Sequence, residues 1–143
     1  MSWTVRNTGL LDASGGWSDG VYLSEDPLLD AADTQLNWLY HSASLTPEGS
    51  YDAAMRVTVP SWQRVGGTHY LLFVADRDAR LAEMDETNNV RAVPMELSGP
   101  DLAATEASAS ASSASPGENV RVRFTIVNRG TVATKTNYWW DAV

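Results

Sequence analysis

Apolar and polar residues alternate in short runs along most of the chain. In the first run Trp3 and Val5 alternate with polar neighbours, and the pattern returns at residues 17–23, 51–59, 69–74 and 90–97. Alternation with a period of two predicts β-strands that each bury one face. Turn residues separate the runs, and no convincing amphipathic helix is found. The pattern predicts an all-β protein, an antiparallel β-sandwich with its core between two sheets. Within the last run Pro94 predicts an edge or bulge position.

The sequence pattern of the first predicted strand occurs a second time near the end of the chain. Residues 1–9 read MSWTVRNTG, and residues 122–130 read VRFTIVNRG, at an offset of 121 (124 − 3). With one inserted residue, WSDGV at residues 17–21 aligns with WWDAV at residues 139–143. These ordered matches predict a repeat of about 120 residues, the size of one sandwich. Both copies close on Asn-x-Gly, where we expect Asn to cap a turn and Gly to adopt a positive φ.

A seam between two repeat copies is predicted at LSGPDL, residues 97–102. We expect residues 1–97 to form a β-sandwich repeat that lacks its first strand. Residues 98–143 are expected to hold a linker and the first two to three strands of the next repeat. A strand is expected through Leu102, then a loop over the Ala- and Ser-rich segment, then a strand at residues 120–126. The strand at residues 101–107 is expected to take the place of the first strand that the repeat at residues 1–97 lacks. It would do so either in the same chain or in another copy by strand exchange.

Several segments resemble the CARDB-type domain, a cell-adhesion-related domain found in bacteria. They are WTVRNTG, WSDGVYLSEDPLLDAADTQL, GGTHYLLFVADRD, EMDETNNV and GPDL. The resemblance covers nearly the whole chain, out of register with the domain boundary. It implies an immunoglobulin-like or fibronectin-like sandwich of seven strands, usually in tandem arrays on large secreted or surface proteins. The expected partners are neighbouring repeats or another copy of the chain, with a cell-surface or polysaccharide ligand as a further candidate. The implied location is extracellular or at the bacterial cell surface.

The composition narrows the classes of partner. The net charge is −8, and no Lys or Arg occurs between Arg6 and Arg56. An acidic surface of this kind repels phosphate backbones, which argues against nucleic acid, and it is compatible with cations. There is no cysteine, which excludes disulfides and thiolate metal sites. No stretch approaches the roughly 18 apolar residues of a membrane helix, so no membrane insertion is expected.

Two acidic segments are candidate calcium sites, because Ca²⁺ prefers oxygen ligands. The candidate ligands are Asp26, Asp30 and Asp33 in one segment and Asp76, Asp78, Glu83, Asp85 and Glu86 in the other. The second segment is not an EF-hand, because Leu81 and Thr87 stand where that loop needs Gly and Glu. The alternative is turn architecture, in which carboxylates accept backbone N–H bonds and Asn88-Asn89 supply left-handed turn residues.

The six tryptophans divide into two groups. Trp3, Trp17 and Trp139 occupy inward strand positions and are expected in the core. The others are candidates for stacking on sugar rings, or for packing under a loop or against a neighbouring unit: Trp38, Trp62 and Trp140.

No catalytic pattern is present. The two histidines, His41 and His69, have no nucleophile elbow or base–orienter pattern near them in the sequence. The sequence therefore predicts a non-enzymatic, extracellular structural or adhesion repeat of a large bacterial protein, with calcium as an optional stabiliser. The alternative is a carbohydrate-binding accessory module that uses exposed tryptophans.

Overall fold

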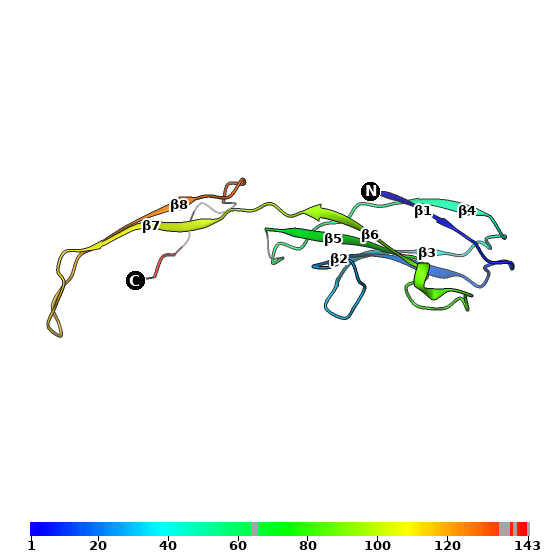
Figure 1. Ribbon diagram of the computed structural model, residues 1–143, viewed down its shortest axis with the longest axis horizontal. Coiled ribbons are helices and arrows are strands. Elements are labelled where there is room, and N and C mark those ends of the chain that lie inside the picture. Colours follow the sequence, from blue (N-terminus) through cyan, green and yellow to red (C-terminus); the bar gives the residue numbers. More distant parts are fainter. Residues whose placement is uncertain (64–65, 135–137, 139, 143) are drawn as a thin grey trace. The chain divides into compact units, whose positions relative to one another are not determined.

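The computed structural model describes residues 1–63, 66–134, 138 and 140–142. The chain divides into two compact units, Met1–Glu96 and Leu97–Val143. Both are built from antiparallel β-strands (Figure 1), so the predicted all-β class is confirmed. Whether the second unit begins another copy of the first stays a prediction.

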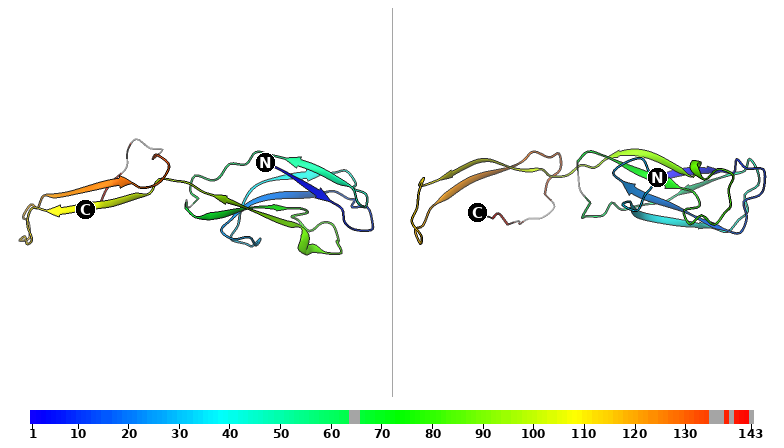
Figure 2. Two further views of the ribbon diagram at one scale, coloured as in Figure 1. Left: turned by 45° about the horizontal axis from the view of Figure 1, so that its top comes forward. Right: turned by 60° about the horizontal axis from the view of Figure 1, so that its bottom comes forward.

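The first unit is a sandwich of two antiparallel sheets. One sheet pairs β1 (Ser2–Arg6) with β4 (Ser50–Ala54). The other has the order β3-β2-β5-β6, with bounds Thr34–His41, Trp17–Ser24, Thr68–Val74 and Val90–Glu96. The β1–β4 pair forms one layer and the four-stranded sheet forms the other, as the views of Figure 1 and Figure 2 show.

The core lies on the two central strands of the larger sheet. β2 pairs with β3 on one side and β5 on the other, and no residue of β2 is exposed. The buried apolar side chains include Trp17, Val21, Leu23, Leu71 and Phe73. Across the sandwich, the ring of Trp3 on β1 lies 5.6 Å from that of Phe73. The predicted inward positions of Trp3 and Trp17 are therefore confirmed.

Two local expectations change in the first unit. β3 was not predicted, because its sequence TQLNWLYH lacks clean alternation. β4 ends at Ala54 instead of residue 59, because its ladder with β1 ends at the Ser2–Ala54 pair. The expectation for Pro94 is confirmed, since it lies in β6, an edge strand of its sheet, where a residue without an N–H to donate is tolerated.

Helical structure is minimal. A short 3₁₀ helix, η1 (Glu86–Asn88), precedes β6. Within the described residues, the structure has no helix with the length and apolar character to cross a membrane.

Among its described residues, the second unit contains one antiparallel pair, β7 (Leu102–Ala109) with β8 (Val122–Asn128). The expected loop after Leu102 is wrong, since the strand continues to Ala109. This Ala- and Ser-rich segment has no row of large apolar side chains. Its backbone hydrogen bonds to β8 keep it extended. No described residue of this unit is buried.

Candidate functional site

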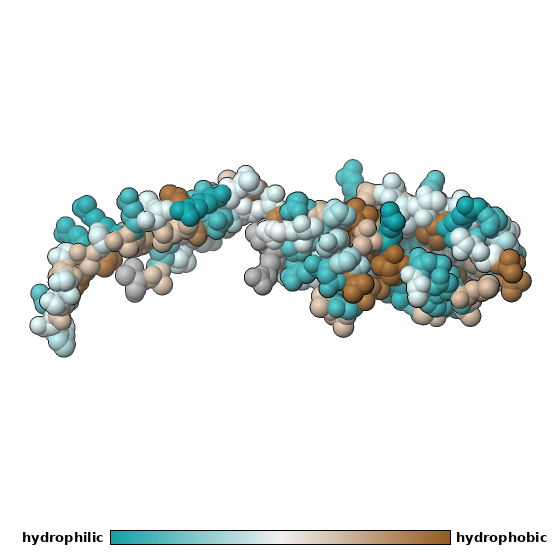
Figure 3. Space-filling model, in the orientation of Figure 1, coloured by the Kyte–Doolittle hydropathy of each residue, from teal (hydrophilic) through white to brown (hydrophobic). Residues whose placement is uncertain are grey.

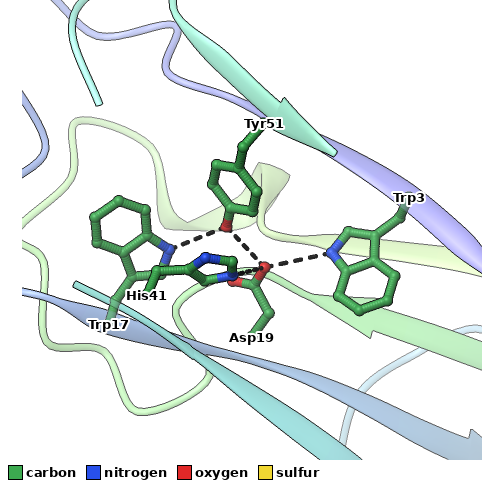
Figure 4. A network of polar contacts seen from close by, with 5 residues as sticks. All are labelled: Trp3, Trp17, Asp19, His41 and Tyr51. Carbon is green, nitrogen blue, oxygen red and sulfur yellow. Dashed lines mark hydrogen bonds and ion pairs between the residues drawn. The ribbon is translucent and has the colours of Figure 1, made fainter. Parts of the chain in front are cut away.

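A buried carboxylate, Asp19 on β2, joins the two sheets of the first unit (Figure 4). Its Oδ2 accepts hydrogen bonds from Trp3 Nε1 on β1 at 3.3 Å and from the Tyr51 hydroxyl on β4 at 2.7 Å. His41 Nε2 on β3 lies 3.0 Å from the same oxygen. Side chains from three other strands, and from both sheets, therefore converge on one carboxylate oxygen.

The geometry follows from strand alternation. Asp19 lies between Trp17 and Val21 on the inward face of β2, so its side chain points at the opposite sheet. Trp17 Nε1 donates to the Tyr51 hydroxyl at 3.1 Å, which extends the network. The rings of His41 and Tyr51 pack beside it with centroids 4.2 Å apart. The network thus encloses a carboxylate that is 0% exposed.

The Tyr51 hydroxyl is held in its neutral form. Burial raises the pKa of Tyr51 far above its ordinary value, and the hydrogen bond to Asp19 raises it further. Asp19 Oδ1 has no hydrogen-bond partner in the described part of the chain. Because a fully buried carboxylate is out of reach of any substrate, the network acts structurally, as a link between sheets.

The first acidic segment folds into turns. Asp26 Oδ1 accepts the N–H of Leu28 at 2.8 Å, and Asp30 Oδ1 accepts that of Ala32 at 2.7 Å. Asp33 Oδ2 accepts the N–H of Asp30 at 2.8 Å. All three carboxylates are exposed or half-buried, and each has a backbone partner within its own loop.

The second acidic segment begins with a buried turn at Asp76. This residue is 5% exposed, and its two carboxylate oxygens accept the N–H groups of Arg80 and Leu81 at 3.1 and 2.7 Å. Asp78 forms an ion pair with Arg77 at 3.0 Å. The left-handed positions of this loop are Asp76 and Ala79, with φ of 43° and 48°. The expectation that Asn88-Asn89 supply them is wrong, since neither has a positive φ.

The remaining acidic residues of this segment surround η1. Asp85 caps the helix by accepting from Thr87 Oγ1 and the Thr87 N–H, and these bonds lower the pKa of Asp85. Glu86 accepts the N–H of Glu83 at 3.2 Å, and Glu83 Oε2 accepts from Asn89 Nδ2 at 2.5 Å. Turn architecture accounts for each of these carboxylates.

No group of three or more acidic or histidine side chains is arranged to hold a metal ion among the residues that the structure describes. Calcium binding at either loop stays a prediction. The carboxylates named for it serve as acceptors within their own turns.

Of the exposed tryptophans, Trp38 lies on β3, whereas Trp62 and Trp140 lie outside the strands. Apolar side chains reach the surface of the first unit (brown in Figure 3). Trp38 is 51% exposed on β3, and Arg77 Cζ lies 5.5 Å from the centroid of its ring. Trp62 is 70% exposed and Trp140 is 94% exposed. Trp139, predicted as a core residue, lies outside the described residues.

Sequence reasoning missed the Asp19 network. Two signals pointed to it. Asp19 occupies an inward position between Trp17 and Val21, and an aspartate, Asp141, stands at the matching position of the predicted repeat. A charged residue in an inward position must find partners, because an unpaired buried charge is costly.

The fold and the inter-sheet network define an immunoglobulin-like β-sandwich module, followed by an additional antiparallel hairpin. The chain matches the CARDB family over residues 1–93 and belongs to that family, an adhesion-related bacterial module that occurs in cell-surface proteins. Searches of curated proteins and of solved structures found no significant match.

The raised pKa of Tyr51 predicts a specific loss of stability in alkali. Stability that depends on the neutral hydroxyl is fully present below the unfolded-state pKa, about 10, and is lost as the pH rises above it. We expect Tyr51→Phe to unfold about 1–3 kcal/mol more easily at neutral pH and to lose less stability above about pH 10. Urea unfolding across this pH range measures both effects.

The matched control is Tyr138→Phe, since Tyr138 is 76% exposed. We expect this variant to keep the wild-type stability and the wild-type alkaline slope. An alkaline slope that is the same in wild type and Tyr51→Phe would contradict the assignment to Tyr51.

Thermal melting decides the calcium prediction. If calcium binds at either loop, the melting midpoint is higher in calcium than in chelator, and an equal midpoint would contradict the calcium prediction. A ligand that binds only the native state raises the midpoint by mass action, so an increase in calcium would establish a calcium site.

Proposed function

We propose that this chain is a non-catalytic structural or adhesion repeat of a bacterial surface or secreted protein. The observation that carries the proposal is that its CARDB-family sandwich uses its buried polar network to link two sheets. Its central carboxylate offers no oxygen to a substrate, because Asp19 is 0% exposed. The carboxylates of the two acidic segments, residues 26–33 and 76–86, have partners within their own loops.

The proposed mechanism is passive. An antiparallel sandwich is a stiff body, and such bodies in series hold a distal domain away from the cell. The β1–β4 layer has only five paired positions, so by itself it would separate easily from the larger sheet. The Asp19 network and the Trp3–Phe73 contact hold the two layers together. This is the property that a spacer under load requires.

Protease treatment of intact cells of the native host tests the location. We expect trypsin to release peptides of this chain from intact cells, because its basic residues include exposed arginines such as Arg80 and Arg91. Lysed cells and a cytosolic marker protein are the controls. Recovery of the peptides only after lysis would contradict a surface role.

A second candidate function, carbohydrate binding, is favoured by an aromatic pair on β3. Trp38 and Tyr40 are 51% and 50% exposed and lie two positions apart, so they share the outward face. Opposite Trp38 in the ladder stands Gly20, and Arg77 Cδ lies 3.1 Å from where a Cβ of Gly20 would be. Glycine therefore leaves room for Arg77 beside the tryptophan ring. Such an aromatic and cationic surface suits stacking on a sugar ring.

A polysaccharide pull-down tests this second candidate. If the β3 pair is the binding surface, Trp38→Ala lowers affinity by about tenfold, which is about 1.4 kcal/mol. Trp62→Ala is the matched control, since Trp62 is more exposed but lies outside the strands. Equal binding by wild type and Trp38→Ala would exclude the β3 surface.

A further inference from the structure

The buried carboxylate of Asp19 has one basic side chain beside it in the described part of the chain, that of His41. Burying a carboxylate without a countercharge is strongly unfavourable. The other ion pairs of the described residues lie elsewhere, and they join Arg6 with Glu48 and Arg77 with Asp78. With His41 Nε2 at 3.0 Å from Asp19 Oδ2, an imidazolium at His41 would neutralise the buried charge.

The aromatic rings around His41 also favour its charged form (Figure 4). The centroid of the His41 ring lies 4.2 Å from that of Tyr51 and 5.7 Å from that of Trp17. Cations are attracted to the faces of Tyr and Trp rings within about 6 Å of the centroid. Burial raises the pKa of Tyr51, so its hydroxyl stays neutral and adds no competing charge.

The geometry places the proton on His41 and not on Asp19. Asp19 Oδ1 is buried and has no partner among the described residues, so a proton on that oxygen would have no acceptor. Oδ2 already accepts from Trp3 Nε1 and from the Tyr51 hydroxyl, so a proton there would face two donors. On His41 Nε2, by contrast, the proton is directed at an acceptor, Oδ2.

His41 can exchange this proton with solvent, because its side chain is 17% exposed, whereas that of Asp19 is fully enclosed. β3, which carries His41, is an edge strand of its sheet. The remaining acidic group at this end of the core is Asp76, which follows β5 and acts on Tyr51 through its charge. Asp76 is 5% exposed, and both its oxygens accept backbone N–H groups. The charge state at the centre of the sandwich therefore depends on His41.

We propose that His41 is a proton-dependent link between the two sheets. Its imidazolium neutralises Asp19 on β2 and packs against Tyr51 on β4. When it loses the proton, the carboxylate stays buried without a countercharge and the sandwich weakens. Histidine changes its charge between about pH 5 and 8, so this stability is fully present in mild acid and is lost as the pH rises. The inference concerns the fold and does not depend on the proposed function.

NMR of the wild-type chain tests the charge state directly, because the chain has only two histidines, His41 and His69. Proximity to the Tyr51 ring identifies the His41 signals, and the ring nitrogen shifts separate imidazolium from neutral imidazole. We expect imidazolium at about pH 6 and a neutral ring at about pH 9, with the melting midpoint falling over the same range. A His41 ring that is neutral at the lower pH, or charged at both, would overturn the proposal.

A double-mutant cycle isolates the pair from every other titrating group, His69 included. Urea unfolding is measured for wild type, Asp19→Asn, His41→Gln and the double variant, at about pH 6 and at about pH 9. At the lower pH, we expect Asp19→Asn to reduce the folding equilibrium constant about tenfold more in wild type than in His41→Gln. At the higher pH this excess should shrink several-fold, because His41 is then neutral.

Asp52→Asn is the matched control, because Asp52 is an exposed carboxylate on the same strand as Tyr51. We expect its effect on the folding equilibrium constant to be the same with and without His41 at both pH values. Equal coupling between Asp19 and His41 at the two pH values would overturn the proposal, since it would indicate a hydrogen bond that does not depend on charge. The NMR measurement uses the wild-type chain, so it decides the question even where a variant fails to fold.

Discussion

The sandwich depends on a buried carboxylate that is shared between its two sheets. Removing an ionisable group from water costs several kcal/mol, and hydrogen bonds to a charged acceptor each return about 1.5–3 kcal/mol. Trp3, Tyr51 and His41 reach Asp19 from three strands, so the cost is offset only when β1, β3 and β4 all lie in their native positions. The carboxylate therefore selects one arrangement of the layers, whereas apolar packing alone would tolerate several.

The strands that the sequence predicted correctly have one apolar face and one polar face, or a continuous apolar run. β1 alternates between Trp3 and Val5 inside and polar residues outside, and β5 is recognisable from its apolar run. β3 was missed because Trp38 and Tyr40 stand on its outer face, where the alternation rule expects polar residues. The length of β7 was missed for the opposite reason: its side chains have little apolar character, and its order comes from the backbone ladder with β8.

The candidate site was predicted less well than the fold, because carboxylates look alike in a sequence. Asp19 and Asp26 both belong to one acidic stretch, yet one is buried between sheets and the other caps a turn. At the Asn-x-Gly ends, the expected side-chain caps are confirmed at Asn7 and Asn128, but the expected positive φ of the glycines is wrong. Gly130 is required because the backbone of residues 99–101 leaves no space for a Cβ, and not because of its own backbone conformation. This contact with a distant segment cannot be recognised in the sequence.

The edges of the two sheets also differ in how they are protected. β6 carries Pro94, and β3 has a register shift where it pairs with Val21 and Tyr22, and both features impede the addition of a further strand. β1 pairs with β4 without any register shift and contains no proline. The edges of the larger sheet therefore carry features that impede further strand pairing, and these features are absent from β1.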